Sequence, residues 1–305
     1  MLENILTVGN QVFILFILIA IGFCCNKAKL FGDIAVKGMT NLVLYIVTPC
    51  VIINSFCREF NSQMLKGLLI TVAVAIITYI IFILLSLVVI HDKDIKRERV
   101  LRFGSVFANC GFMSLPLQAA ILGPDGVFYG AVYIAIFNIT FWTYGVYLMS
   151  GDIKNVSGKK LILNPGIIGT ILGMIVFFIP YELPTTLKTA ISHMAALNTP
   201  VPMIVIGYHL AATGLKIKGV PVYLAMLLKL IIFPFIMLFG CLAFGISGTI
   251  MISLVISAAS PIAAVTTMFS ERFGQDTPLS ASIVSISTLI SIITMPIIIG
   301  IAMAF

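Results

Sequence analysis

About ten long apolar runs fill this sequence, and nearly all of the charged residues lie in the short segments between them. Hydrophobic residues make up 60% of the 305 residues, and charged residues make up only 10%. Soluble domains average about 45–50% apolar and about 25% charged residues, so this chain needs lipid rather than water around it. Ten spans of roughly 20 residues would use about 200 residues and leave no room for a soluble domain. We therefore expect residues 1–305 to form a single unit embedded in the lipid bilayer.

The spans must be helices, because lipid cannot satisfy the hydrogen bonds of an exposed backbone. The apolar runs thus predict an all-α membrane protein with ten transmembrane helices. The predicted spans are 5–25, 36–57, 65–90, 100–122, 126–149, 161–180, 185–212, 220–244, 248–269 and 278–304.

The positive charges predict the orientation of these spans. Fourteen of the eighteen lysine and arginine residues lie in the loops that follow odd-numbered spans. They are Lys27, Lys29, Lys37, Lys93, Lys96, Arg97, Arg99, Arg102, Lys154, Lys159, Lys160, Lys216, Lys218 and Arg272. The positive-inside rule then places both termini outside the cytoplasm in a multi-pass protein of the cell membrane. Because these charges do not gather on one face, the net charge of +7 does not indicate a nucleic-acid partner.

Prolines interrupt the predicted spans at matching places in the two halves of the chain. Pro49 and Pro116 fall in the second and fourth spans, and Pro200 and Pro261 fall in the seventh and ninth. With Pro202, the prolines of the second and seventh spans are predicted hinges or breaks. Each half holds five helices, an odd number, so the second half enters the membrane from the opposite face. Paired interruptions in such an inverted repeat indicate the binding site of a transporter.

The fourth span contains the first candidate site. Gly111 and Pro116 both disfavour a continuous helix, and the backbone groups that they free need partners in the membrane. Asn109 and Ser114 lie beside this interruption and predict a polar cavity. A proline kink whose backbone groups are satisfied by neighbouring helices is the alternative.

The ninth span supplies the counterpart around Ser260 and Pro261, followed by Thr266 and Thr267. If both helices break at mid-membrane and cross, two half-helix N-termini point into one cavity. Such ends carry partial positive charge and bind anions. All eleven acidic residues lie in loops or at helix ends, which favours an anionic or neutral substrate over a cation.

Lys229 is the one charge that lies deep inside a predicted span. A lysine at mid-helix costs about 2.5–3.5 kcal/mol on insertion scales, so it is a candidate for a functional role. Alternatively, its long side chain reaches the membrane interface.

Enzyme motifs are incomplete or absent. The stretch Gly245-Ile246-Ser247-Gly248 matches the GxSG pattern of rhomboid proteases, but no histidine follows His209 to act as a base. The chain has neither an HExxH motif nor a CxxC pair, so we expect no enzyme activity, no metal site and no bound cofactor.

Taken together, the order and spacing of several motifs resemble one known family. The motifs are Asn109-Cys110-Gly111-Phe112-Met113-Ser114-Leu115-Pro116, Gly123, Asn138, Trp142-Thr143, Asn164-Pro165, Thr199-Pro200, Gly207, Lys229, Pro234, Ser260-Pro261, Glu271-Arg272-Phe273-Gly274-Gln275-Asp276 and Thr294-Met295-Pro296. Over nearly its whole length the chain resembles bacterial members of the auxin efflux carrier family, whose fold is similar to that of bile acid:sodium symporters.

The resemblance implies two structural parts. Residues 1–60 and 161–212 would form a scaffold, often dimeric, and residues 61–160 and 213–305 would form a transport part. The fourth and ninth spans would cross at Pro116 and Pro261. The predicted substrate-binding residues are Asn109, Cys110, Gly111, Ser114, Pro116, Asn138, Lys229, Ser260, Pro261, Thr266 and Thr267.

The predicted function is secondary transport of a small organic anion, a mono- or dicarboxylate, by an elevator-like motion. Family members carry auxin in plants or malate and malonate in bacteria. Only residues 150–160 stand where many plant members have a long cytoplasmic loop, which favours a bacterial carboxylate. Two alternatives stay open: a sodium-coupled symporter of the bile acid type, and a membrane sensor that does not transport. The coupling ion, a proton or sodium, is also open.

Overall fold

A computed structural model describes residues 2–179, 183–212 and 218–305, and the regular elements of these residues are helical. The α-helices are α1 (Leu2–Lys27), α2 (Asp33–Leu42), α3 (Thr48–Phe56), α4 (Ser62–Val89), α5 (Ile95–Val106), α6 (Leu115–Thr140), α7 (Val146–Ser150), α8 (Gly158–Ile162), α9 (Pro165–Phe178), α10 (Thr185–Ala196), α11 (Pro200–Ala212), α12 (Val220–Leu227), α13 (Phe233–Ala243), α14 (Gly248–Ala259), α15 (Val265–Arg272) and α16 (Thr277–Ala302). Four π-helical segments join neighbouring helices at Val43–Val47, Cys110–Ser114, Phe141–Gly145 and Leu228–Ile232. The expectation of an all-helical protein is confirmed.

Several of these helices are long and apolar enough to cross a membrane. Among the described residues there are seven such stretches, and the two shorter helices α9 and α14 are apolar as well. The predicted spans 100–122 and 248–269 are not single helices, because breaks at 107–109 and 260–264 divide them. The predicted integral membrane protein is confirmed, and the two broken spans are the ones expected to carry the site.

The outward faces of the long helices are apolar. Phe13 and Ile17 of α1, Ile77 and Leu84 of α4 and Ile171 of α9 are each between 47% and 60% exposed. In water this much uncovered apolar surface would drive association. In a bilayer these side chains contact the acyl chains instead.

The prolines of the second and fourth predicted spans lie differently from the expectation, whereas the seventh predicted span is divided into two helices. Pro49 and Pro116 were expected to interrupt their helices, but each lies in the first turn of an α-helix that continues directly from a π-helical segment. The wider π turn accommodates the ring and the missing N–H of the proline without breaking the helix. In the seventh predicted span, α10 ends at Ala196 and α11 begins at Pro200. Pro202 lies inside the first turn of α11.

Glycines let α1 and α11 pack backbone against backbone. A Cβ atom on Gly22 would lie 2.1 Å from the carbonyl oxygen of Ile204, and one on Gly207 would lie 1.9 Å from that of Ile19. Small residues that allow such close approach are a common means of helix association in lipid. The two helices therefore form a tightly packed pair.

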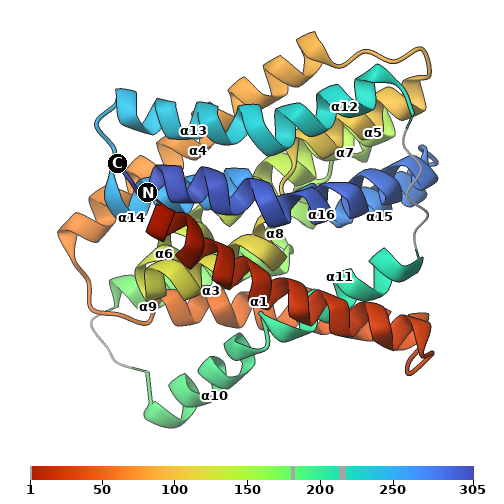
Figure 1. Cartoon of the computed structure of the whole chain (residues 1–305). Helices are drawn as coiled ribbons and strands as arrows, with labels where there is room; N and C mark the ends of the chain where they lie inside the picture. Colours follow the sequence, from red (N-terminus) through yellow and green to blue (C-terminus); the bar gives the residue numbers. More distant parts are fainter. Residues whose placement is uncertain (1, 180–182, 213–217) are drawn as a thin grey trace.

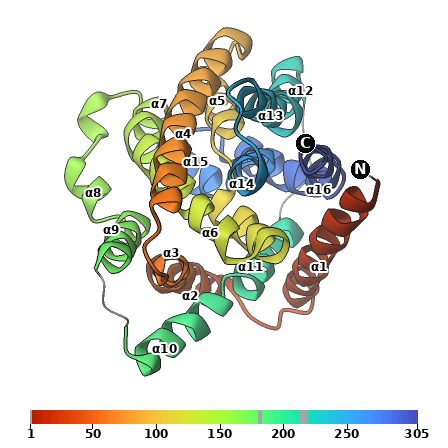
Figure 2. The same ribbon diagram turned by 90° about the vertical axis from the view of Figure 1, so that its left-hand side faces the viewer.

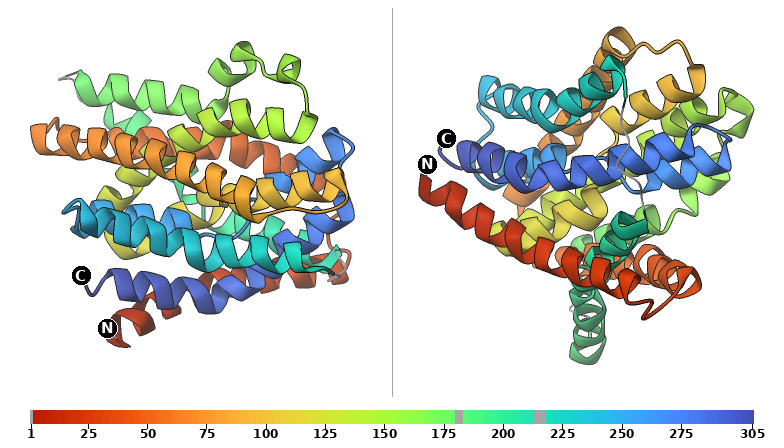
Figure 3. Two further views of the ribbon diagram at one scale, coloured as in Figure 1. Left: turned by 90° about the horizontal axis from the view of Figure 1, so that it is seen from above. Right: turned by 45° about the vertical axis from the view of Figure 1, so that its right-hand side comes forward.

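The helices are arranged in two groups that lie side by side. Figure 1 shows α1, α3, α10 and α11 on one side of the molecule and α4, α5, α12 and α13 on the other, with α16 between them. Figure 2, viewed along the helices, shows α14, α15 and α6 in the interior. The two termini lie at the same end (Figure 3), where the Asn4 side chain donates a hydrogen bond to the Met303 carbonyl at 3.0 Å.

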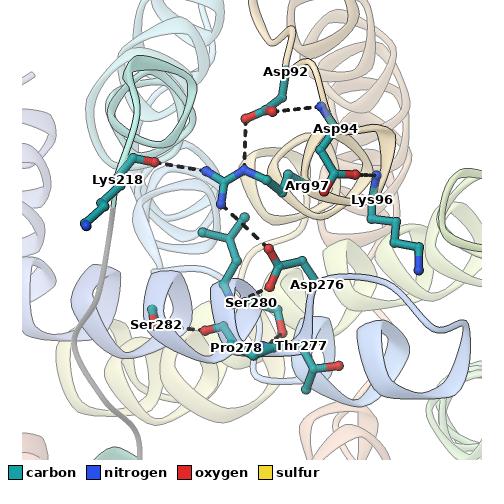
Figure 4. A network of polar contacts seen from close by, with 11 residues as sticks. Asp92, Asp94, Lys96, Arg97, Lys218, Asp276, Thr277, Pro278, Ser280 and Ser282 are labelled. Carbon is teal, nitrogen blue, oxygen red and sulfur yellow. Dashed lines mark hydrogen bonds and ion pairs between the residues drawn. The ribbon is translucent and has the colours of Figure 1, made fainter.

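A polar network joins three loops at the opposite end of the molecule (Figure 4). The Arg97 guanidinium lies 3.2 Å from the Asp92 carboxylate and 3.6 Å from that of Asp276, and it donates to the Lys218 carbonyl at 2.9 Å. Asp276 also accepts a hydrogen bond from the backbone N–H of Leu279 and so caps α16. Arg97 thus holds together the starts of α5, α12 and α16.

Candidate functional site

The two helix breaks meet in the interior of the protein. The backbone N–H of Asn109 donates to the Pro261 carbonyl at 2.7 Å, and that of Ala263 donates to the Phe107 carbonyl at 3.0 Å. Between these two bonds, Ala108 and Ile262 form an antiparallel bridge. We call the bridged segments 107–109 and 260–264 the crossover. The breaks in the fourth and ninth predicted spans thus meet, and in the fourth span the break lies at 107–109 and not at Pro116.

Side chains satisfy backbone groups that the crossover leaves without helical partners. The break removes the usual helical donor to the Ala258 carbonyl, and the Lys229 ammonium donates to this oxygen at 2.9 Å. The N–H of Ile262 donates to the Ser287 hydroxyl at 3.1 Å. A lysine at the C-terminal end of α14 also complements the negative end of the helix dipole. These contacts give the free backbone groups of the break hydrogen-bond partners and so stabilise the broken helix.

A cavity of about 290 Å³ lies against the crossover. Asn109 and Gly111 line it from one break, Ala264 and Val265 line it from the other, and Asn138 of α6 adds a further amide. We call it the crossover cavity. Its remaining wall is rich in aromatic side chains, which are Tyr45, Phe112, Phe137, Phe141, Trp142 and Phe269.

A second cavity of about 200 Å³ shares part of this wall. Asn109, Phe112 and Val265 border both cavities, so the crossover separates them only in part. The second cavity extends toward α11 and α16, where His209 and Glu271 line it.

The first turns of both half-helices contain backbone N–H groups without a backbone partner. Among the described residues, the N–H groups of Cys110, Gly111 and Val265 form no backbone hydrogen bond, whereas those of Thr266 and Thr267 donate to the Ala263 and Ala264 carbonyls. Gly111 and Val265 belong to these first turns and line the crossover cavity. The Asn109 side-chain amide has no hydrogen-bond partner among the described residues, and the residue is 6% exposed. Uncommitted donors from two helix N-termini make the cavity suitable for an anion.

Only some of the predicted site residues border these cavities. Asn109, Gly111 and Asn138 line the crossover cavity, and Asn109 and Thr267 line the second one. Pro116 lines a different hollow of about 340 Å³ toward the end of the molecule that carries the termini. Besides Pro116, the predicted residues that border neither of the two cavities are Cys110, Ser114, Lys229, Ser260, Pro261 and Thr266.

Lys229 is fully buried, so its side chain does not extend to the membrane interface as one interpretation supposed. Its ammonium bonds to the Ala258 carbonyl behind the crossover. Ser260 likewise uses its hydroxyl within α14, on the Ile256 carbonyl at 3.0 Å. These two side chains bond to carbonyls of α14 and line neither cavity, so any role in binding would be indirect.

A buried polar seam between α6 and α14 was not predicted. The Gln118 side chain donates to the Ser253 carbonyl and to the Ser257 hydroxyl, both at 2.9 Å. Ser257 also lies 3.2 Å from the Ser114 hydroxyl, and Ser253 donates to the Gly126 carbonyl at 3.0 Å. The seam fixes the two interrupted spans against each other.

Three further residues of the crossover cavity were missed as site residues, namely Asn164, Trp142 and Arg272. Asn164 caps α9 by accepting hydrogen bonds from the N–H groups of Gly166 and Ile167. All three fall within motifs of the sequence resemblance, so the signal was present. Their place beside Asn109 could not be derived from the sequence, because it depends on how the π-helical segment Phe141–Gly145, α9 and α15 pack.

Comparison with known proteins agrees with this architecture. A family model described as membrane transport protein matches the chain twice, over residues 7–156 and 149–299. An uncharacterised transporter of Methanocaldococcus jannaschii is 24% identical over 302 residues, covering 93% of this chain and 95% of the relative. An uncharacterised transporter of Methanothermobacter thermautotrophicus is 22% identical, with 92% of this chain and 93% of the relative covered. A protein named as a candidate malonate transporter of Rhizobium meliloti is 20% identical, with 85% of each chain covered. The two matches together span nearly the whole sequence, so the chain belongs to the membrane transport protein family, that of the auxin efflux carriers.

Proposed function

We propose that this protein is a secondary transporter of a small organic anion, which it binds in the crossover cavity. The observation that carries the proposal is that two half-helix N-termini open on one cavity, which Asn109 lines with an unpaired side-chain amide. Membrane transport itself follows from the family. The identity of the substrate as an anion rests on the chemistry of this cavity.

The donors at the crossover favour a negative ligand over a positive one. The first-turn N–H groups and the amides of Asn109 and Asn138 offer hydrogen-bond donors to a carboxylate. Among the described residues that line the crossover cavity, none is acidic. A cationic substrate would therefore find no counter-charge there, whereas a carboxylate would find several donors.

We further propose ten membrane crossings arranged as two inverted repeats of five. The double family match, with each part close to half the chain, supports the repeat. The meeting of one broken span from each half at the crossover supports the pairing of the fourth and ninth spans. An even number of crossings agrees with the two termini lying at the same end of the molecule (Figure 3).

An elevator-like motion would divide the protein into two parts. Residues 1–60 and 161–212 would be the scaffold, and residues 61–160 and 213–305 would move. The backbone-to-backbone packing of α1 on α11 through Gly22 and Gly207 suits a rigid scaffold. In this proposal a second copy of the chain would dimerise through the same scaffold helices in the cell membrane.

A ligand screen on the purified protein tests the proposal. Short mono- and dicarboxylates should raise the thermal transition of the protein, because a ligand that binds the folded state stabilises it. Malonate is included because of the distant relative that carries its name. If neutral or cationic compounds stabilise the protein and carboxylates do not, the assignment of an anion is wrong. Dependence of the shift on sodium would favour sodium coupling over proton coupling.

A further inference from the structure

Arg272 brings a positive charge to the crossover cavity. It is the last residue of α15, and it is the one charged residue among the described residues that line this cavity. Its guanidinium lies 5.5 Å from the centre of the Phe273 ring, and no carboxylate of the described residues lies within ion-pair distance of it. A cation at the edge of an otherwise uncharged cavity is available to a ligand.

One face of α15 lines the crossover cavity. Val265, Met268 and Arg272 share one face of the helix, and all three line the cavity. Seven residues of helix separate Val265 from Arg272, which is about 10.5 Å along the axis. Because Arg272 is exposed and also lines the cavity, it lies at the outer rim of the cavity.

The cavity therefore has two electropositive poles with an apolar wall between them. The first pole is formed by the amides around Asn109, Gly111 and Val265, and the second pole is Arg272. Phe137 and Trp142 form part of the wall between them. A monocarboxylate can satisfy only one pole, whereas a short dicarboxylate can satisfy both.

We propose that Arg272 binds a second carboxylate of the substrate and so determines selectivity for dicarboxylates over monocarboxylates. This inference rests on the proposed function of the crossover cavity. With carbon–carbon bonds of about 1.5 Å, dicarboxylates of three to five carbons place their carboxyl groups a few ångströms apart, so that one carboxylate can bind the amides while the other extends toward the long side chain of Arg272. Arginine suits this role because its planar guanidinium pairs with a carboxylate through two parallel hydrogen bonds.

Glu271, the residue before Arg272, places a negative charge at the second cavity. Glu271 lines the second cavity together with His209 and not the crossover cavity, since successive residues of a helix point about 100° apart. The end of α15 thus presents a cation to the cavity with two half-helix N-termini and an anion to the adjoining one. Because the positive and negative charges lie at different cavities, a dianion should enter the crossover cavity from the side of Arg272.

Binding of each diacid and of its monoester to the unmodified protein and to an Arg272 variant tests the inference. Binding of malonate, succinate and glutarate, and of the monomethyl ester of each, is measured by calorimetry on the detergent-purified protein and on Arg272→Ala. The ester keeps the length of the diacid and removes one charge. The expected result is about tenfold weaker binding of the best diacid to Arg272→Ala, equivalent to 1.4 kcal/mol, and less than a twofold change for its ester. Arg272→Lys should recover part of the loss.

The control removes a different cation at the same end of the molecule. Lys93 is exposed in the loop before α5 and lines neither cavity, so Lys93→Ala should leave both affinities unchanged. If Arg272→Ala weakens diacid and ester equally, or neither, the assignment of Arg272 is wrong while the crossover site stands. If the unmodified protein binds none of these ligands, the crossover site for short carboxylates and this inference both fail.

Discussion

Replacement of Asn109 separates the role of its side chain from that of its backbone. The backbone N–H bonds to the Pro261 carbonyl and the backbone carbonyl accepts from Met113, and both bonds survive a change of side chain. The side-chain amide has no partner among the described residues. Asn109→Ala should therefore leave the fold and the crossover intact and remove one donor from the cavity.

The expected loss follows from the strength of that donor. A hydrogen bond to a charged group contributes about 1.5–3 kcal/mol, so the affinity for a carboxylate should fall roughly ten- to a hundredfold. Asn109→Asp should be worse, because it sets a negative charge against the anion. At about 4 Å and an effective dielectric constant of about 20, two like charges repel by about 4 kcal/mol.

The assay is calorimetric titration of the best carboxylate from the ligand screen. Asn155→Ala, which removes an exposed amide from the loop before α8, is the matched control and should bind normally. Thermal unfolding without ligand should be nearly the same for all three variants. If Asn109→Asp binds the carboxylate as tightly as the unmodified protein, the binding site does not lie at this crossover.

Three further predictions follow from packing and charge. Lys229→Met leaves the Ala258 carbonyl without its donor, so carboxylate binding and transport should fall while the protein still inserts in the membrane. Lys229→Arg should retain part of both activities. Normal transport by Lys229→Met would show that the ammonium is dispensable. Gly207→Ala forces α1 and α11 apart and should lower the thermal transition by an amount equivalent to about 1–3 kcal/mol. Gly38→Ala is the control, because its Cβ would meet open space, and it should leave the transition unchanged. Equal transitions of the two variants would refute the close packing. A cysteine placed at Lys154 should react with a membrane-impermeant reagent only from the cytoplasmic side, and labelling of intact cells would contradict the proposed orientation.

Much of the fold was predictable because lipid restricts the backbone to helices. The runs of apolar residues predicted where helices lie, and the paired prolines indicated that the fourth and ninth spans contain the candidate site. The exact break of the fourth span was not predictable from Pro116, since a π-helical turn at Cys110–Ser114 accommodates this residue. The break instead lies several residues earlier, where the bridge to the other half replaces the helical hydrogen bonds.

The site was predictable only in part, for a related reason. Asn109 and Gly111 were identified because they lie next to the interruption, and both line the cavity. Ser260 and Lys229 also lie next to an interruption, but their polar atoms bond to carbonyls of α14. Sequence patterns show that a residue is polar and near a break. They do not show whether its hydrogen bonds are already used within the protein.

Counterflow of a labelled carboxylate into proteoliposomes tests the central claim most directly. Liposomes that hold the purified protein are loaded with the unlabelled carboxylate identified by the screen, and uptake of the labelled compound is followed. The account predicts transient accumulation above the equilibrium level with the unmodified protein, and uptake no faster than in empty liposomes with Asn109→Asp. Binding of the carboxylate without any counterflow would contradict a transporter and indicate a membrane sensor instead.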